Sequence, residues 1–151
     1  MSAVIRKADP TDLCRIAEIL VFSKRINYRP IFHNDAYSFG ELQVVNVMRK
    51  YETQPERLEK TWVYDDGFVK GLIQIGGQEI ETLYVDPFFT SGGIGGQLLD
   101  FAVRQFGANT LWVLEKNAKA RQFYQRHGFC PAGERILEPE TPEYLLKMHR
   151  P

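Results

Sequence analysis

Residues 83–99 read LYVDPFFTSGGIGGQLL. Leu83 and Val85 alternate with their neighbours in the manner of a strand, which Pro87 ends because proline has no N–H to donate to a ladder. Beyond the glycines, apolar residues recur at helical spacing and predict an amphipathic helix. They are Ile94, Leu98, Leu99, Ala102, Val103 and Phe106.

Glycine fills four of the five positions from Gly92 to Gly96. A first helical turn without side chains leaves its unpaired N–H groups open to a ligand. The helix dipole makes an anion the favoured ligand at that end. We therefore expect this segment to hold a phosphate or pyrophosphate group.

The rest of the chain alternates strands and helices around this stretch. Asp9 and Pro10 predict a helix N-terminus, and the apolar spacing that follows continues to Val21, after which residues 24–39 read as irregular and aromatic. The other predicted helices are 40–51 and 117–127, and the predicted strands are 3–8, 61–64, 68–75, 78–85, 110–114, the segment from 129 onward, and 144–148. This order predicts one α/β (α+β) domain over residues 1–151.

Composition narrows the class of partner. Lys+Arg and Asp+Glu number 19 each, so no basic excess exists to bind nucleic acid. No apolar run approaches the roughly 18 residues of a membrane span, and the start carries no signal peptide. Cys14 and Cys130 lie far apart without metal-like spacing, so we expect a reduced, cytoplasmic protein without a metal.

A second motif, together with the glycine segment, points to a protein family. Residues 117–129 read NAKARQFYQRHGF, which follows the pattern N-x-x-A-x-x-F-Y-x-x-x-G-F. Together the two segments resemble the GNAT superfamily of N-acetyltransferases, specifically over residues 79–129. The resemblance implies a twisted mixed sheet flanked by helices, in which the two parallel strands 79–85 and 110–114 splay apart to admit a coenzyme.

The resemblance implies acetyl-CoA as the cofactor and an acyl transfer to an amine. The family signature Gln/Arg-x-x-Gly-x-Gly/Ala becomes Thr90-Ser91-Gly92-Gly93-Ile94-Gly95 here, with Thr90 in place of the long side chain. The backbone of Leu83 and Val85 is expected to bond the pantetheine arm like an added strand. The implied coenzyme-binding residues are Leu83, Tyr84, Val85, Thr90, Ser91, Gly92, Gly93, Ile94, Gly95, Gly96, Asn117, Ala120, Phe123 and Tyr124.

Tyr124 is the candidate catalytic acid that the resemblance implies. Its phenol, with an ordinary pKa near 10, is protonated at neutral pH and can donate to the departing sulfur. Alternatively, Tyr124 is a core aromatic beside Phe123, and Asn117 is an N-cap as well as a contact of the coenzyme.

Glu79 and Glu81 are the candidate bases. They lie two apart on a predicted strand and are therefore expected to share a face. An alkylamine has a pKa of about 10.4 and an ordinary Glu about 4.3, a gap of about 8 kcal/mol, so we expect transfer through water. The alternative is that both are solvated strand residues.

The aromatic stretch between the first two predicted helices is where the family places its acceptor. Tyr28, Phe32 and His33 are therefore the candidate substrate-binding residues, with Tyr37 and Phe39 beside them. A further run of acidic residues has the charge to attract a cationic amine or is a solvated loop. It comprises Glu134, Glu138, Glu140 and Glu143.

Several functions stay open beside the leading one, an N-acetyltransferase that acts on the primary amine of a small molecule. A protein or peptide acetyltransferase and a non-catalytic acyl-CoA-binding module share the same motifs. A dinucleotide-binding domain is disfavoured, because Leu98 replaces the third glycine of G-x-G-x-x-G. The sequence does not name the acceptor or the oligomeric state, and a homodimer is one candidate.

Overall fold

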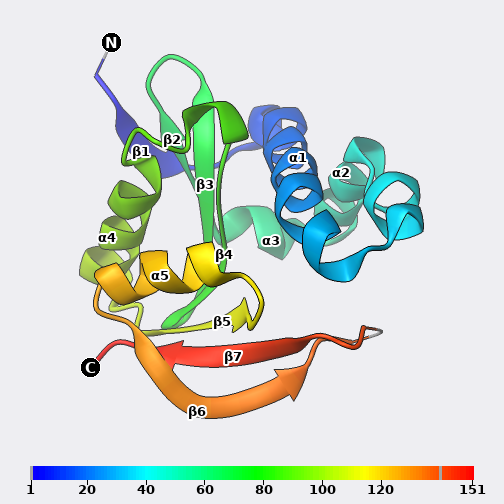
Figure 1. The fold of residues 1–151 in the computed structure, drawn as a ribbon. Coiled ribbons are helices and arrows are strands. Elements are labelled where there is room, and N and C mark those ends of the chain that lie inside the picture. Colours follow the sequence, from blue (N-terminus) through cyan, green and yellow to red (C-terminus); the bar gives the residue numbers. More distant parts are fainter. Residues whose placement is uncertain (1, 140) are drawn as a thin grey trace.

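The computed structural model describes residues 2–139 and 141–151. Seven strands form one mixed sheet in the order β1-β2-β3-β4-β5-β7-β6, with helices on both faces (Figure 1). The strands are β1 (Val4–Lys7), β2 (Thr61–Asp65), β3 (Val69–Gly76), β4 (Glu79–Val85), β5 (Thr110–Leu114), β6 (Cys130–Leu137) and β7 (Tyr144–His149). The helices are α1 (Leu13–Phe32), α2 (Val44–Thr53), α3 (Pro55–Glu59), α4 (Ile94–Phe106) and α5 (Ala118–Arg126), with short turns η1 (Pro10–Asp12), η2 (Ala36–Glu41) and η3 (Pro87–Phe89).

Two apolar clusters hold helices against the sheet. One joins α4 to the middle strands through Leu98, Leu99 and Ile73. The other joins α1 and α2 to β2 and β3 through Ile16, Tyr51 and Leu72. The helices therefore cover the sheet from opposite faces, and the fold class predicted from the sequence is confirmed.

The β4–α4–β5 unit is the only parallel connection within the described residues. β4 and β5 pair at just two positions, Glu79 with Thr110 and Ile80 with Leu111. Beyond Ile80, β4 stays paired with β3, while β5 continues along β7. The two parallel strands thus part near the middle of the sheet.

Helix α1 is longer than predicted. The prediction of irregular chain from Lys24 is wrong as far as Phe32, because α1 continues through Pro30 to that residue. Proline removes one helical hydrogen bond, which normally ends a helix. Here the last turn is held by packing, since the Phe32 ring meets those of Tyr28 and Tyr37 at centroid distances of 5.4 and 5.9 Å.

The segment after α1 also differs from the prediction. Residues 36–41 form a π-helical turn, and α2 begins at Val44 rather than Gly40. Helix α3, which starts at Pro55, has no counterpart in the prediction. These elements depend on contacts with α1 and with one another, which local sequence patterns do not reveal.

Candidate active site

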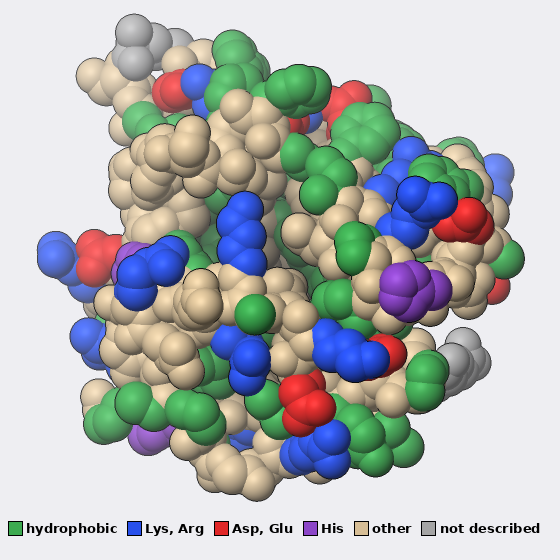
Figure 2. Space-filling model, in the orientation of Figure 1, with side chains coloured by type: hydrophobic (Ala, Val, Ile, Leu, Met, Phe, Trp, Pro, Cys, Tyr) green, Lys and Arg blue, Asp and Glu red, His purple; other side chains and the backbone are tan. Residues whose placement is uncertain are grey.

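A cavity of about 790 Å³ opens where β4 and β5 part. Its walls come from α1, the open edge of β4, β5, the start of α4, and α5. Figure 2 shows a hollow on this side of the molecule, with hydrophobic side chains at its bottom and basic side chains at its edge. The separation of the strands thus creates space between the two helical layers.

A bulge in β4 coincides with this separation. Ile75 pairs with Ile80 and Gln74 with Thr82, so Glu81 is an extra residue on β4. A bulge bends its strand and re-aims the neighbouring side chains. The prediction that Glu79 and Glu81 share a face requires an unbroken alternation, which the bulge at Glu81 interrupts.

The two candidate bases differ in their access to the cavity. Glu81 lines the cavity, and its Oε1 accepts a hydrogen bond from Gln74 Nε2 at 3.3 Å and lies 3.8 Å from Lys60 Nζ. Glu79 is not among the residues that line the cavity. Glu81 is therefore the better placed carboxylate.

The start of α4 offers free backbone donors. Gly93 is in the left-handed conformation with φ of 77°, which favours glycine. Within the described residues, no hydrogen bond is donated by the N–H groups of residues 93–96, whereas Gln97 N–H donates to Gly93 O. These N–H groups, with the dipole of the 13-residue α4 behind them, favour an anion.

Gly95 and Gly96 have a second use that the sequence argument missed. A β-carbon on Gly95 would lie 3.4 Å from the Phe123 ring, and one on Gly96 would lie 3.0 Å from His127 Nε2. The absence of side chains therefore lets α5 pack closely against the first turn of α4. Of the predicted coenzyme residues in this segment, Thr90, Gly93, Gly95 and Gly96 line the cavity, and Ser91, Gly92 and Ile94 do not.

Helix α5 brings the other motif to the same cavity. The Asn117 side chain caps the helix by accepting from Ala120 N–H at 3.2 Å, and Asn117 also lines the cavity. Tyr124 packs between the rings of Phe123 and Phe129 at centroid distances of 5.2 and 6.0 Å. Burial raises the pKa of the Tyr124 phenol above its ordinary value, so the phenol keeps its proton at neutral pH.

The aromatic side of the cavity comes from α1. Tyr28 and Phe32 line it, and the Tyr28 hydroxyl is hydrogen-bonded to the Tyr84 hydroxyl of β4. Burial raises the pKa of both phenols, so this contact joins two neutral groups. Tyr84, predicted to contact coenzyme, thus also meets the candidate acceptor residues.

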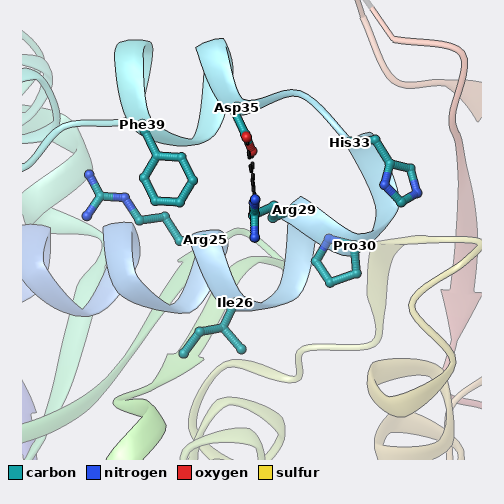
Figure 3. A pocket seen from close by; sticks show the side chains of 7 residues that line it. All are labelled: Arg25, Ile26, Arg29, Pro30, His33, Asp35 and Phe39. Atoms are coloured by element: carbon teal, nitrogen blue, oxygen red, sulfur yellow. Dashed lines mark hydrogen bonds and ion pairs between the residues drawn. The ribbon is translucent and has the colours of Figure 1, made fainter.

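His33 lies outside this cavity. It ends α1 with φ of 52° and borders a separate open hollow with Arg25, Arg29 and Phe39 (Figure 3). In that hollow Arg29 Nε is 2.8 Å from Asp35 Oδ1, and Arg25 donates to backbone carbonyls of Ser38 and Leu42. These guanidinium groups already hold the turn after α1.

The predicted acidic run is only partly available to a cation. Glu134 lies 3.4 Å from Lys147 Nζ, and Glu143 lies 3.1 Å from Lys116 Nζ. Glu138 lines the cavity, whereas Glu140 lies outside the described residues. Glu138 is therefore the member of the run placed to act on a cavity ligand.

Several cavity residues were not anticipated. Lys24 lies about one helical turn before Tyr28 and Asn27 lies directly before it, so extending the predicted helix would have revealed both. Lys119 and His127 lie four residues on either side of Phe123, so the helical period of α5 groups them. Trp112 and Arg126 also line the cavity.

The comparisons with known proteins agree with this geometry. A family model described as "Acetyltransferase (GNAT) domain" matches residues 57–131. This span contains the bulged strand, the glycine-rich turn and α5. The chain belongs to the GNAT acetyltransferase superfamily.

One curated relative of this GNAT chain is an uncharacterized N-acetyltransferase in the pepI 3′ region of Lactobacillus delbrueckii subsp. lactis. It is 33% identical over 79 residues, which cover 47% of this chain and 46% of that protein. The match thus spans less than half the length of that relative.

Two solved structures share the GNAT fold over nearly the whole chain. YjaB from Escherichia coli, solved in its apo form, has a TM-score of 0.73 at 21% identity, covering 99% of this chain and 97% of that one. PaiA N-acetyltransferase from Thermoplasma acidophilum, solved with coenzyme A, has a TM-score of 0.70 at 21% identity, with 97% and 98% covered.

Two further findings concern other kinds of site. None of the helices in the described part of the chain has the length and apolar character needed to cross a membrane. Across residues 2–139 and 141–151, no group of three or more His, Cys, Asp or Glu side chains is arranged to hold a metal ion.

Proposed function

We propose that this GNAT protein transfers the acetyl group of acetyl-CoA to the primary amine of a small molecule. One observation carries the proposal: a single cavity joins the free N–H groups of α4, the open edge of β4 and the Tyr124 phenol. The family match and the coenzyme A complex of the PaiA neighbour support the choice of coenzyme.

The chain offers a binding group for each part of this coenzyme. The N–H groups of residues 93–96 suit its pyrophosphate. The edge of β4 at Leu83 and Val85 has no strand partner on the β5 side, so its backbone suits the amides of the pantetheine arm. Asn117, at the start of α5, faces the same space.

The reaction is an attack of a neutral amine on the thioester that acetyl-CoA supplies. Glu81, whose carboxylate accepts a hydrogen bond from Gln74, accepts the amine proton through water. Tyr124 holds a proton at its hydroxyl for the departing sulfur, because burial keeps this phenol neutral. The two groups thus divide the roles of base and acid.

The size of the cavity favours a small acceptor. Its volume of about 790 Å³ lies within the range of small-molecule sites, roughly 300–1,000 Å³. Part of that space is needed for the coenzyme arm, so the remainder suits a compact amine.

The test combines binding and turnover. Calorimetry with acetyl-CoA should show saturable binding, and a thiol-release assay over a panel of amines and peptides should show turnover of small amines. Absence of binding contradicts the proposal. Binding without turnover supports a non-catalytic module, and turnover of peptides alone supports a peptide acetyltransferase.

A further inference from the structure

Lys24 is a half-buried cation that lines the acceptor side of the cavity. Within the described residues, no hydrogen bond starts at its Nζ and no carboxylate lies within 4 Å of it. Another basic side chain, Lys60, has Glu81 of the β4 bulge as a partner. Lys24 therefore presents an ammonium group without a fixed counterion.

The surroundings of Lys24 favour an anion. Burial lowers the pKa of its ammonium, and the nearby charges of Lys50 and Arg57 act in the same direction. Glu138 is the acidic group that acts against them, but it forms no ion pair with Lys24. A desolvated cation without a partner is unfavourable, and an anionic ligand group would relieve that cost.

The position of Lys24 relates this charge to the site of acetyl transfer. Lys24 and Tyr28 are four residues apart on α1, so their side chains lie on one face about one helical turn apart. Tyr28 is bonded to Tyr84 and lies near enough to Tyr124 to affect the pKa of that phenol. Lys24 and the proposed acid Tyr124 thus line the same cavity.

The cavity also carries the opposite charge. Glu81 lines it on β4, and no ion pair joins Glu81 to Lys24. A ligand with an ammonium and an anionic group can therefore meet a complementary charge at each end. Asn27, one residue before Tyr28, adds an amide donor to the cavity wall.

We propose that the acetyl acceptor is a short amine that also carries a carboxylate, an amino acid, and that Lys24 binds this carboxylate. The proposal rests on the proposed acetyltransferase function. It narrows the acceptor from primary amines in general to amines with a negative charge a few bonds away.

The test compares matched acceptors in wild type and Lys24→Met. Each amino acid of a panel is paired with its own carboxamide, and thiol release gives kcat/KM for both. The wild type should prefer the acid by about 10- to 100-fold, as expected for a hydrogen bond between charged groups. Lys24→Met should reduce this preference to less than about threefold, mainly through KM, and Lys24→Arg should retain part of it.

Two controls separate binding from folding. Lys7→Met removes an exposed lysine of β1 and should leave the preference unchanged. The affinity of Lys24→Met for acetyl-CoA, measured by calorimetry, should stay within about twofold of wild type. Thermal melts of wild type with coenzyme A give a second readout, because amino acids should stabilise it more than their amides.

Three outcomes overturn the assignment of the acceptor while leaving the acetyltransferase function intact. They are equal turnover of acids and amides, an unchanged preference in Lys24→Met, and a preference for peptides over free amino acids. Wild type that binds no acetyl-CoA overturns the proposed function itself. Wild type that binds coenzyme but neither acetylates amino acids nor is stabilised by them over amides overturns the acceptor proposal.

Discussion

Tyr124 illustrates how burial suits a side chain to its proposed role. A phenol in water loses its proton near pH 10, close to the range in which amines become nucleophilic. Packing against Phe123 and Phe129 raises the pKa of Tyr124, so the phenol remains a donor while the amine is neutral. The same packing fixes the ring and leaves the hydroxyl as its polar part.

Replacing Tyr124 by phenylalanine tests this role directly. We expect kcat to fall about 100-fold or more, because a positioned acid contributes about 10²- to 10⁴-fold. The affinity for acetyl-CoA should change by less than about twofold, since the ring is kept. Tyr144→Phe is the matched control and should keep full activity, because the Tyr144 ring stacks on Arg135 of β6. Equal rates in Tyr124→Phe and wild type would assign the acid elsewhere.

The two carboxylates of β4 give a second paired test. Glu81 lines the cavity and Glu79 does not, although the two differ by only two positions. We expect Glu81→Gln to lower kcat/KM about 10- to 100-fold, because the acceptor of the amine proton is lost. Glu79→Gln should stay within about twofold of wild type. The reverse ranking would show that the bulge does not select the base.

At the scale of elements, the first turn of α4 combines two requirements. Its N–H groups must stay free for an anion, and its side-chain positions must admit α5. Gly93 meets the first requirement through its positive φ, and Gly95 and Gly96 meet the second by leaving room for Phe123 and His127. One glycine-rich segment therefore serves both the cavity and the packing of its wall.

Two glycines with similar backbones separate these effects. Gly93 and Gly77 both have positive φ, 77° and 61°, and a β-carbon on either would meet no atom within 4 Å. Alanine at either position should lower the free energy of unfolding by about 1–2 kcal/mol through backbone strain. Only Gly93→Ala should also weaken acetyl-CoA binding, by about tenfold, because Gly93 lines the cavity. Calorimetry on both variants makes the comparison, and equal affinities would place the pyrophosphate elsewhere.

At the scale of the whole molecule, a charge network ties the N-terminal strand to the fold. Arg6 of β1 donates to both oxygens of Asp12 at 2.8 and 2.9 Å, and its Nε donates to Asp65 of β2 at 3.2 Å. The hydrogen bonds from Arg6 keep the pKa of the buried Asp12 carboxyl below its usual value. The start of α1 and the edge of the sheet are therefore linked through ionised groups.

This network predicts how stability depends on pH. A lowered carboxyl pKa contributes stability above the ordinary value of about 3.9, and this contribution is lost as pH falls below it. Asp12→Asn should lower the free energy of unfolding by about 2 kcal/mol at pH 7, with a smaller difference from wild type near pH 3. Urea unfolding at both pH values measures this. Asp35→Asn, in the exposed pair with Arg29, should alter the pH dependence far less, because solvent screens an exposed ion pair. Parallel pH curves for Asp12→Asn and wild type would contradict the argument.

Much of the architecture follows from local patterns in the sequence. The apolar period from Ile94, the N-cap Asn117 and the strand at residues 110–114 were predicted at or near their observed positions. These features depend on neighbours in the chain, namely helical spacing, capping groups and the lack of a donor at Pro87. Through the resemblance to the GNAT family, the two motifs also predict that Tyr124 and the glycines bind one coenzyme, and Tyr124, Gly93, Gly95 and Gly96 line one cavity.

Tertiary structure alone decided which residues line the acceptor side of the cavity. Packing of Phe32 against Tyr28 and Tyr37 carries α1 through Pro30 and thereby brings Phe32 to the cavity. The shift of register between β3 and β4 makes Glu81 the extra residue of β4, and Glu81 rather than Glu79 lines the cavity. Contacts between distant segments outweigh local propensity at both places, because burial of aromatic rings offsets the lost helical bond and strand pairing sets where the extra residue lies.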